Sequence, residues 1–294
     1  MSTTAEVPGG FRLMGIVNVT PDSFSDGGRF LEAGAAIEHG RRLAAEGADI
    51  LDIGGESTRP GAEPVSEQQE LARVLPVIEG LAAAEIGARI SVDTSKAGVA
   101  EAALQAGATL VNDVSAMRAD PRMAEVVARS GAECCLMHML GEPRTMQREP
   151  RYDDVVDEVK AFLQERLELA VASGVHEQRI LLDPGIGFGK TDVHNLELLL
   201  RLDELCDLGP PIVIGTSRKA FIGRILARAA ARREPVDVSQ RLAGTLATNV
   251  LAYERGARVF RVHEVAPVRD ALAVAAATLG GRWTASSAGT TRTS

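Results

Sequence analysis

The sequence predicts an α/β fold in which eight parallel strands, each followed by a helix, close into a (β/α)8 or TIM barrel. Two observations favour this architecture. Eight apolar runs alternate with segments rich in Ala, Leu and Glu along the 294 residues. The runs are nearly continuous, which is typical of strands buried on both faces of a parallel sheet. A doubly wound open sheet is the alternative, but eight regular units favour the barrel.

The expected strands are short and follow one another along the whole chain. They cover residues 12–19, 48–54, 88–94, 109–115, 134–139, 179–184, 211–217 and 257–263. Four of them follow a Gly, in EGADI, AGATL, SGAEC and RGARV, and Gly just past a helix end is the usual turn into a strand. Helical stretches include residues 33–47, 67–84, 153–173, 239–255 and 265–279, and longer surface loops are expected at 142–151 and 228–238.

A single domain is expected over residues 11–283, between a flexible N-terminus at 1–10 and a disordered tail at 284–294. The net charge of −8 argues against nucleic acid or an anionic membrane surface as a partner. Three cysteines are too few for a disulfide framework, so a reducing compartment is expected. With no signal peptide and no apolar stretch of about 18 residues, we expect a soluble, cytoplasmic protein.

Polar side chains stand at the C-terminal end of every expected strand. They are Asn18, Glu56, Asp93, Asn112, His138, Asp183, Ser217, Lys219, Arg261 and His263. In a barrel these ends meet on one face, where active sites lie. A lone Asp or Asn at a strand end often only caps the next helix. Because a polar residue stands at the end of all eight strands, capping alone is a poor explanation. Buried carboxylates and amides need hydrogen-bond partners, and a polar ligand in the barrel mouth would supply them.

The residue types indicate two kinds of ligand group. Asp93, Asn112 and Asp183 offer acceptors that suit a flat heterocycle with ring N–H and amino donors. Lys219, Arg261 and His263 make a cationic patch that suits a phosphate or diphosphate. Together they predict a nitrogen-rich ring joined to a phosphorylated group.

One glycine-rich stretch imitates a phosphate-binding loop. PGIGFGKT, residues 184–191, has Pro184 where the P-loop motif needs Gly, so we interpret its glycines as a tight turn beside Asp183. Lys190 in this stretch has no assigned role. His138 is either a wall of the site or a hydrogen-bonded core group.

At this point the motifs resemble those of the bacterial dihydropteroate synthases. The matching stretches are MGIVNVTPDSFSDGG, ILDIGGESTRPGA, ISVDTSK, LVNDVSA, LMHM, ILLDPGIGFGK, GTSRKAFIG and FRVHEV, and they run from residue 14 to residue 265. The resemblance implies a TIM barrel that joins 4-aminobenzoate to 6-hydroxymethyl-dihydropterin diphosphate, giving dihydropteroate and diphosphate. It also implies a requirement for Mg²⁺ and a homodimer.

The resemblance implies a role for each matching residue. The pterin-binding positions are Asp93, Asn112, Asp183 and Lys219. The diphosphate-binding positions are Asn18, Arg261 and His263, with Asn18 linked to Mg²⁺. The aminobenzoate positions are Phe24, Thr58, Arg59, Pro60, Phe188 and Ser217. The catalytic residues are Asp93, Lys219, Arg261 and His263.

One departure and two alternatives remain. Glu264 stands where the family commonly has Asp, and we expect little effect from the extra methylene. A methyltetrahydrofolate:corrinoid methyltransferase would share Asp93, Asn112 and Asp183 but would not need the TSRK or STRPG segments. A non-catalytic pterin-binding protein would have no use for intact loops.

Overall fold

The protein is described here by a computed structural model that covers residues 10–19, 29–57 and 61–280, without the side chains of residues 29–32. The predicted flexible N-terminus, apart from Gly10, and the predicted tail lie outside these ranges. The proposed limits of the domain therefore stay a prediction.

Eight parallel strands form a nearly closed barrel, so the predicted fold class is confirmed. The strands are β1 (Arg12–Asn18), β2 (Ile50–Gly54), β3 (Arg89–Asp93), β4 (Leu110–Asp113), β5 (Glu133–Met137), β6 (Ile180–Asp183), β7 (Val213–Ile214) and β8 (Val259–Val262). Their order in the sheet is β6-β5-β4-β3-β2-β1-β8-β7. A parallel bridge between Leu182 and Ile212 joins the two end strands and completes the ring.

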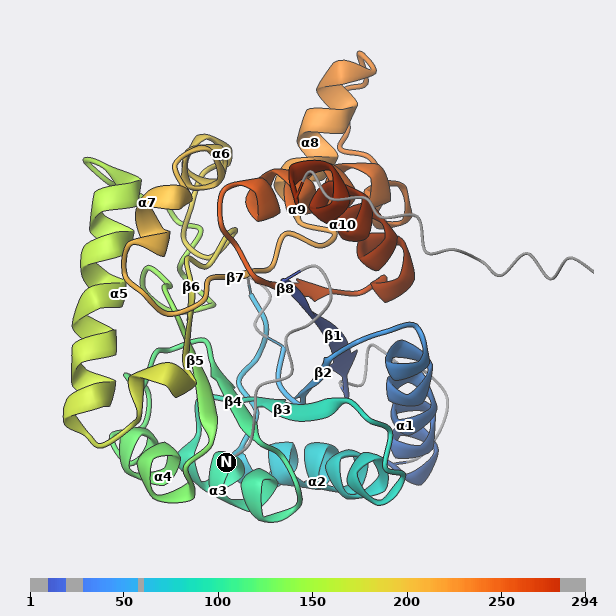
Figure 1. The fold of residues 1–294 in the computed structure, drawn as a ribbon, viewed down its shortest axis with the longest axis vertical. Coiled ribbons are helices and arrows are strands. Elements are labelled where there is room, and N and C mark those ends of the chain that lie inside the picture. Colours follow the sequence, from blue (N-terminus) through green and yellow to red (C-terminus); the bar gives the residue numbers. More distant parts are fainter. Residues whose placement is uncertain (1–9, 20–28, 58–60, 281–294) are drawn as a thin grey trace, which may run out of the picture.

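Helices surround the strands (Figure 1). They are α1 (Arg29–Ala45), α2 (Glu67–Ala83), α3 (Ala97–Gln105), α4 (Met123–Ser130), α5 (Val155–Ala172), α6 (Asp192–Leu200), α7 (Asp203–Cys206), α8 (Ala220–Ala229), α9 (Leu242–Glu254) and α10 (Val265–Gly280), with short 3-10 turns η2 (Glu177–Arg179) and η3 (Val238–Gln240). The five expected helices are present within a few residues. The loop expected at 228–238 is shorter, because α8 continues to Ala229 and η3 begins at Val238.

Side-chain alternation along the strands sorts residues between the barrel interior and the helix layer. The lower interior is filled by one buried cluster with members on seven of the strands: Met14, Ile50, Leu110, Cys135, Leu181, Val213 and Val259. The residues that directly follow members of this cluster point the other way and belong to the larger core under the helices, as do Leu51, Val111, Leu136 and Phe260. A residue two positions after a member of the interior cluster therefore also faces the barrel axis, nearer its C-terminal end.

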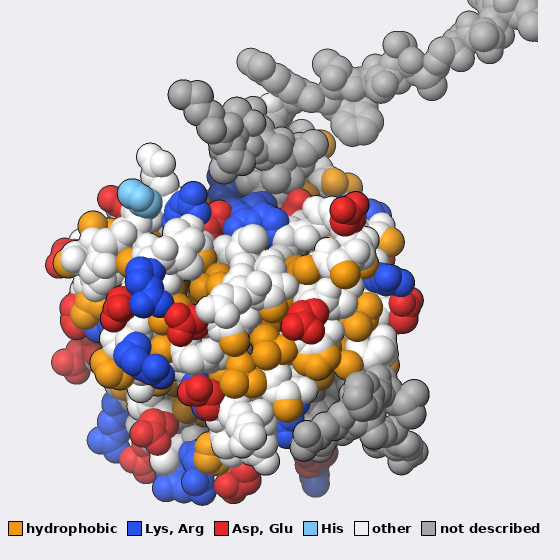
Figure 2. Space-filling view, turned by 90° about the horizontal axis from the view of Figure 1, so that it is seen from below, with side chains coloured by type: hydrophobic (Ala, Val, Ile, Leu, Met, Phe, Trp, Pro, Cys, Tyr) orange, Lys and Arg blue, Asp and Glu red, His pale blue; other side chains and the backbone are white. Residues whose placement is uncertain are grey.

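The surface shows no dominant charge on the face seen in Figure 2, where acidic and basic side chains lie side by side among apolar ones. Within the described ranges, no helix is long and apolar enough to cross a membrane.

The turn after β6 depends on close backbone approach. Gly185 has φ +66°, and a Cβ there would overlap the carbonyl oxygen of His138. Gly131 has the same φ of +66°, but a Cβ there would meet no heavy atom within 4 Å. The two glycines therefore separate the cost of a left-handed backbone from the cost of a steric clash.

Gly185→Ala should lower the free energy of unfolding more than Gly131→Ala does. The Gly131 variant carries only the left-handed penalty of about 1–2 kcal/mol. The Gly185 variant must also displace backbone, at about 1–3 kcal/mol more. Urea denaturation of both variants measures the difference, and equal losses would show that the turn has room for a side chain.

Candidate active site at the C-terminal end of the barrel

Strand alternation brings four of the predicted polar residues to the inner face of the barrel mouth. Asn112, Asp183 and Arg261 each lie two positions beyond a residue of the apolar interior cluster. Asp93 pairs in register with Asn112 on the next strand, and Met137 pairs with Asp183. The apolar interior thus ends in a polar layer that opens towards the loops.

A buried carboxylate that sequence reasoning missed links these residues. Asp52 on β2 is fully buried and pairs in register with Ser91 on β3. Its Oδ2 accepts from Arg261 Nε at 2.6 Å and from Asn112 Nδ2 at 3.0 Å, and its Oδ1 accepts from Ser91 Oγ at 2.6 Å. Asp52 therefore orients a predicted pterin residue and a predicted diphosphate residue at once.

Asp93 shares the same arginine. Arg261 Nη2 donates to Asp93 Oδ2 at 2.8 Å, so one guanidinium bridges two carboxylates. Burial raises the pKa of Asp93 to about 7, against the opposing effect of Arg261. The two carboxylates in turn hold the pKa of Arg261 above its ordinary value, so this side chain stays charged. The pKa of Asp93 therefore lies close to neutral pH, well above that of an exposed aspartate.

Asp183 closes the opposite side of the polar layer. It is 6% exposed, and its Oδ1 accepts from the Gly185 backbone N–H at 2.7 Å. Burial raises the pKa of Asp183, while this hydrogen bond and the Lys219, Arg261 and Lys190 charges oppose the rise. A carboxylate surrounded by donors in this way is suited to accept hydrogen bonds from a ligand.

Lys219 stands next to an aromatic wall. Its Nζ lies 4.1 Å from the centre of the Phe188 ring, within range of a cation–π contact. Phe188 packs on a small apolar cluster made of Val114, Met137, Met139 and Met146. Burial and the nearby Arg261 lower the pKa of Lys219 to about 8. These groups give the barrel mouth one apolar and one polar side.

The ends of β7 and β8 are joined where α8 begins. Ser217 Oγ lies 2.9 Å from His263 Nδ1 and accepts from the His263 backbone N–H at 3.2 Å. Arg218, with φ +60°, donates through Nε to Glu264 at 2.6 Å. Glu264 therefore secures the loop that carries Ser217, while the small effect expected of its extra methylene stays a prediction. Backbone N–H groups at a helix start favour an anion, as does the neighbouring Arg261.

Two of the polar strand-end residues do not face the mouth. Glu56 accepts from Lys96 Nζ at 2.6 Å and from the Val65 backbone at 2.8 Å, so it closes the second loop. His138 is buried with its Nδ1 2.8 Å from Lys190 Nζ, which makes it a hydrogen-bonded core group. Four aminobenzoate predictions lie outside the described residues: Phe24, Thr58, Arg59 and Pro60.

The residues at the end of β1 have room for a cation, although the described parts of the chain contain no group of three or more His, Cys, Asp or Glu that could hold a metal alone. A Cβ on Gly54 would lie 3.8 Å from Asn18 Oδ1 and 3.5 Å from the Asp93 Cβ. Glycine therefore keeps a gap between an amide oxygen and a carboxylate. Such oxygen donors fit Mg²⁺ that also carries phosphate oxygens.

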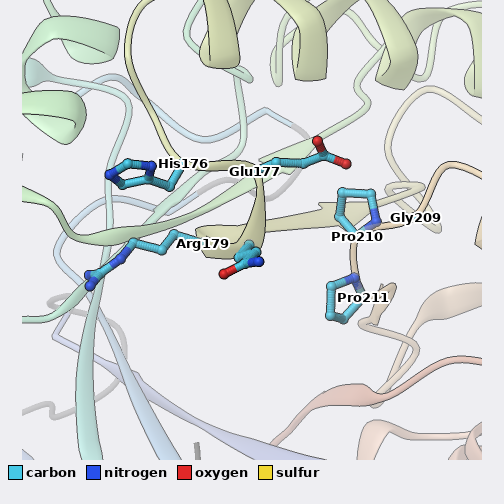
Figure 3. Close-up of a pocket in the computed structure, with 7 residues that line it drawn as sticks. His176, Glu177, Arg179, Gly209, Pro210 and Pro211 are labelled. Carbon is cyan, nitrogen blue, oxygen red and sulfur yellow. The ribbon is translucent and has the colours of Figure 1, made fainter. Parts of the chain in front are cut away.

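A hollow at the other end of the barrel lacks this chemistry. It lies between η2 and residues 209–211, before the starts of β6 and β7 (Figure 3). Its Arg179 donates to the Gly131 carbonyl oxygen. Among the side chains that line the hollow, none is a buried charged group. The polar layer at the C-terminal end is therefore the candidate site.

Comparisons with known proteins identify the family of this chain. Residues 14–263 match the family described as pterin binding enzyme. Dihydropteroate synthase of Haemophilus influenzae is 44% identical over 91% of this chain and 94% of its own length. Dihydropteroate synthase of Mycobacterium leprae is 48% identical over 91% of this chain and 93% of its own.

Solved structures give the same result. The Xanthomonas albilineans dihydropteroate synthase with 4-aminobenzoic acid has a TM-score of 0.83 and 50% identity, covering 91% of this chain and 93% of that one. The same organism's enzyme in complex with 7,8-dihydropteroate has a TM-score of 0.80 and 47% identity, with the same coverage. The chain therefore belongs to the pterin-binding enzymes, in the family of the dihydropteroate synthases.

Proposed function

We propose that this chain condenses 4-aminobenzoate with 6-hydroxymethyl-dihydropterin diphosphate, releasing 7,8-dihydropteroate and diphosphate. The observation that carries the proposal is the polar layer in which one hydrogen-bond network joins Asp93 and Asn112 to Arg261, with Asp183 close enough for the Arg261 charge to oppose the rise that burial causes in its pKa. A ring site and an anion site that share one hydrogen-bond network suit a substrate with both groups.

The pterin ring is held by acceptors. Asn112 gives its amide nitrogen to Asp52, which leaves the amide oxygen for a ring donor. Asp93 and Asp183 accept from ring N–H and amino groups, in the manner of carboxylates that accept paired donors. Lys219 donates to the ring from the side of Phe188.

The anion site stabilises the leaving group. Breaking the bond between the methylene carbon and diphosphate leaves a cation that the electron-rich dihydropterin delocalises, and the carboxylates favour it. Arg261, His263 and the start of α8 stabilise the negative charge that departs. The neutral arylamine nitrogen then bonds to the carbon and loses its proton, so no strong general base is needed.

Mg²⁺ fits this site as a partner of the diphosphate. Asn18 would hold it, beside the gap that Gly54 leaves next to Asp93. When bound, the ion supplies further charge stabilisation to the diphosphate. We further propose that the protein is cytoplasmic, as its composition predicts, and that it forms a homodimer, as the family resemblance implies.

The direct test is release of diphosphate that depends on aminobenzoate. The purified protein, given both substrates and Mg²⁺, should form dihydropteroate and diphosphate in equal amounts. Release without aminobenzoate, or methyl transfer from methyltetrahydrofolate to a corrinoid protein, would contradict the proposal. Pterin binding with no turnover would support the non-catalytic alternative.

The affinity for a pterin without diphosphate should depend on pH in a bell shape. Affinity should rise as Asp93 ionises through about 7 and fall as Lys219 loses its proton through about 8. Calorimetry across this interval measures it. Asp93→Asn should remove the acid limb and keep the alkaline limb, and an unchanged acid limb would reject Asp93 as its source.

The pH dependence of stability must be measured in parallel, because the titration of Asp93 affects stability as well as binding. The pKa of Asp93 is raised on folding, so its contribution to stability is present below its unfolded pKa and is lost as the pH rises through about 7. Melting temperatures recorded at each pH separate this loss from the change in binding.

A further inference from the structure

Lys190 and His138 form a buried pair that the proposed reaction does not use. Lys190 is 3% exposed, and its Nζ lies 2.8 Å from His138 Nδ1 and 3.0 Å from the Phe188 carbonyl oxygen. Among the residues that the structure describes, no carboxylate lies within salt-bridge distance of Lys190. Burying a cation without an acid partner lowers the stability of the folded state. A lysine that faced solvent would not carry this desolvation cost.

The pair lies outside the pocket wall. Met137 and Met139 belong to the apolar cluster at the mouth, so His138 between them faces the opposite side of the strand. There its ring meets the Phe162 ring of α5 edge-on, with centroids 4.8 Å apart. His138 therefore faces away from the polar layer, and Lys190 Nζ lies against the His138 ring.

The pair holds the loop that does line the pocket. Phe188 donates its N–H to Gly185 O at 3.0 Å, and Lys190 Nζ donates to the carbonyl of the same residue. Tyr152 fixes the next carbonyl, that of Gly189, at 2.8 Å. With both of its backbone polar groups bonded, the Phe188 residue has little freedom, and its ring is directed against Lys219.

The surroundings of Lys190 bring its titration close to neutral pH, and both the ammonium and the neutral amine carry N–H groups that can donate. Asp183 raises the pKa of Lys190, whereas burial and Lys219 lower it to about 7. Burial, Lys190 and Arg118 lower the pKa of His138 to about 2, so the imidazole is neutral and its Nδ1 accepts. The neutral histidine thus orients Lys190 Nζ, which holds the loop through the Phe188 carbonyl.

We propose that Lys190, oriented by His138, is a positioning residue for the pterin pocket, because it holds the Phe188 carbonyl and thereby fixes the Phe188 ring beside Lys219. The inference rests on the proposed function and adds two residues to its site. It differs from a purely structural role in one respect: the effect on pterin binding must pass through the Phe188 ring.

The first test is Lys190→Met, which keeps the length of the side chain and removes the charge. Calorimetry with a pterin that lacks diphosphate should show an affinity at least about tenfold lower than that of the wild type. Arg89→Met is the matched control, because Arg89 pairs with Glu133 at 2.8 Å at the other end of the barrel. The control should lose melting temperature without losing affinity.

A double-mutant cycle with Phe188→Ala tests the route of the effect. If Lys190 acts through the ring, Lys190→Met should change pterin affinity by less than about twofold in the Phe188→Ala background. The full loss in that background would overturn the proposal and leave Lys190 as a fold-stabilising residue.

If Lys190→Met does not fold, two substitutions at His138 test the proposal independently. His138→Asn keeps an acceptor near the position of Nδ1 and should bind pterin within about threefold of the wild type. His138→Phe keeps a ring without the acceptor and should match the loss of Lys190→Met. Equal affinity of the two histidine variants would overturn the proposal.

These outcomes are distinct from failure of the proposed function. A wild type that binds no pterin would remove the proposed function, and the positioning role with it. If the wild type binds pterin and the Lys190→Met variant binds it with equal affinity, only the positioning role is contradicted.

Discussion

The site depends on one buried carboxylate. Asp52 is enclosed by three side-chain donors, from Ser91, Asn112 and Arg261, and has no exposed surface. Because a single acceptor group orients both Asn112 and Arg261, the ring-binding and anion-binding halves of the pocket cannot move independently. The guanidinium continues the network to Asp93, so the five polar residues form a unit at the top of an apolar barrel interior.

Such a unit is costly to bury and is tolerated because its members satisfy one another. Two carboxylates taken out of water would be strongly destabilising without the arginine between them. The arrangement also leaves acceptor capacity unused, since one guanidinium bridges two carboxylates. A ligand with ring donors completes the hydrogen bonding, and a ligand with an anionic group completes the charge. The site is thus arranged for a molecule that carries both.

Much of this could be predicted from the sequence. The eight strands follow from apolar runs separated by helix-ending glycines, and these features are local. Asp93, Asn112 and Asp183 were identified because each interrupts or ends an apolar run at the edge where barrel strands meet. Asp52 interrupts ILDIG in the same way, but it lies inside the strand, where a polar residue at the strand end does not point to it. Its position two residues after Ile50 places it on the inner face, and period-two alternation would have found it.

Other features could not be predicted because they depend on contacts between distant segments. Glu56 has the right type and position for a site residue, but Lys96, 40 residues away, takes its carboxylate. Lys190 lies in a stretch that resembles a P-loop but lacks one of its glycines, and its partner His138 lies 52 residues earlier. In each case the sequence gives the residue type, and only the packing of neighbouring units decides which way the side chain turns.

The most direct test of this account is Asp52→Asn, with Ser91→Ala as a milder control. Asn keeps one acceptor oxygen but removes the negative charge that faces Arg261, whereas loss of the Ser91 hydroxyl leaves the charge and the other two hydrogen bonds in place. The measurement is calorimetry of two separate ligands, a pterin without diphosphate and inorganic diphosphate with Mg²⁺. The account predicts that Asp52→Asn weakens both by about tenfold or more and that Ser91→Ala weakens both less. Loss of affinity for one ligand only, in a folded variant, would contradict the claim that one carboxylate holds the two halves together.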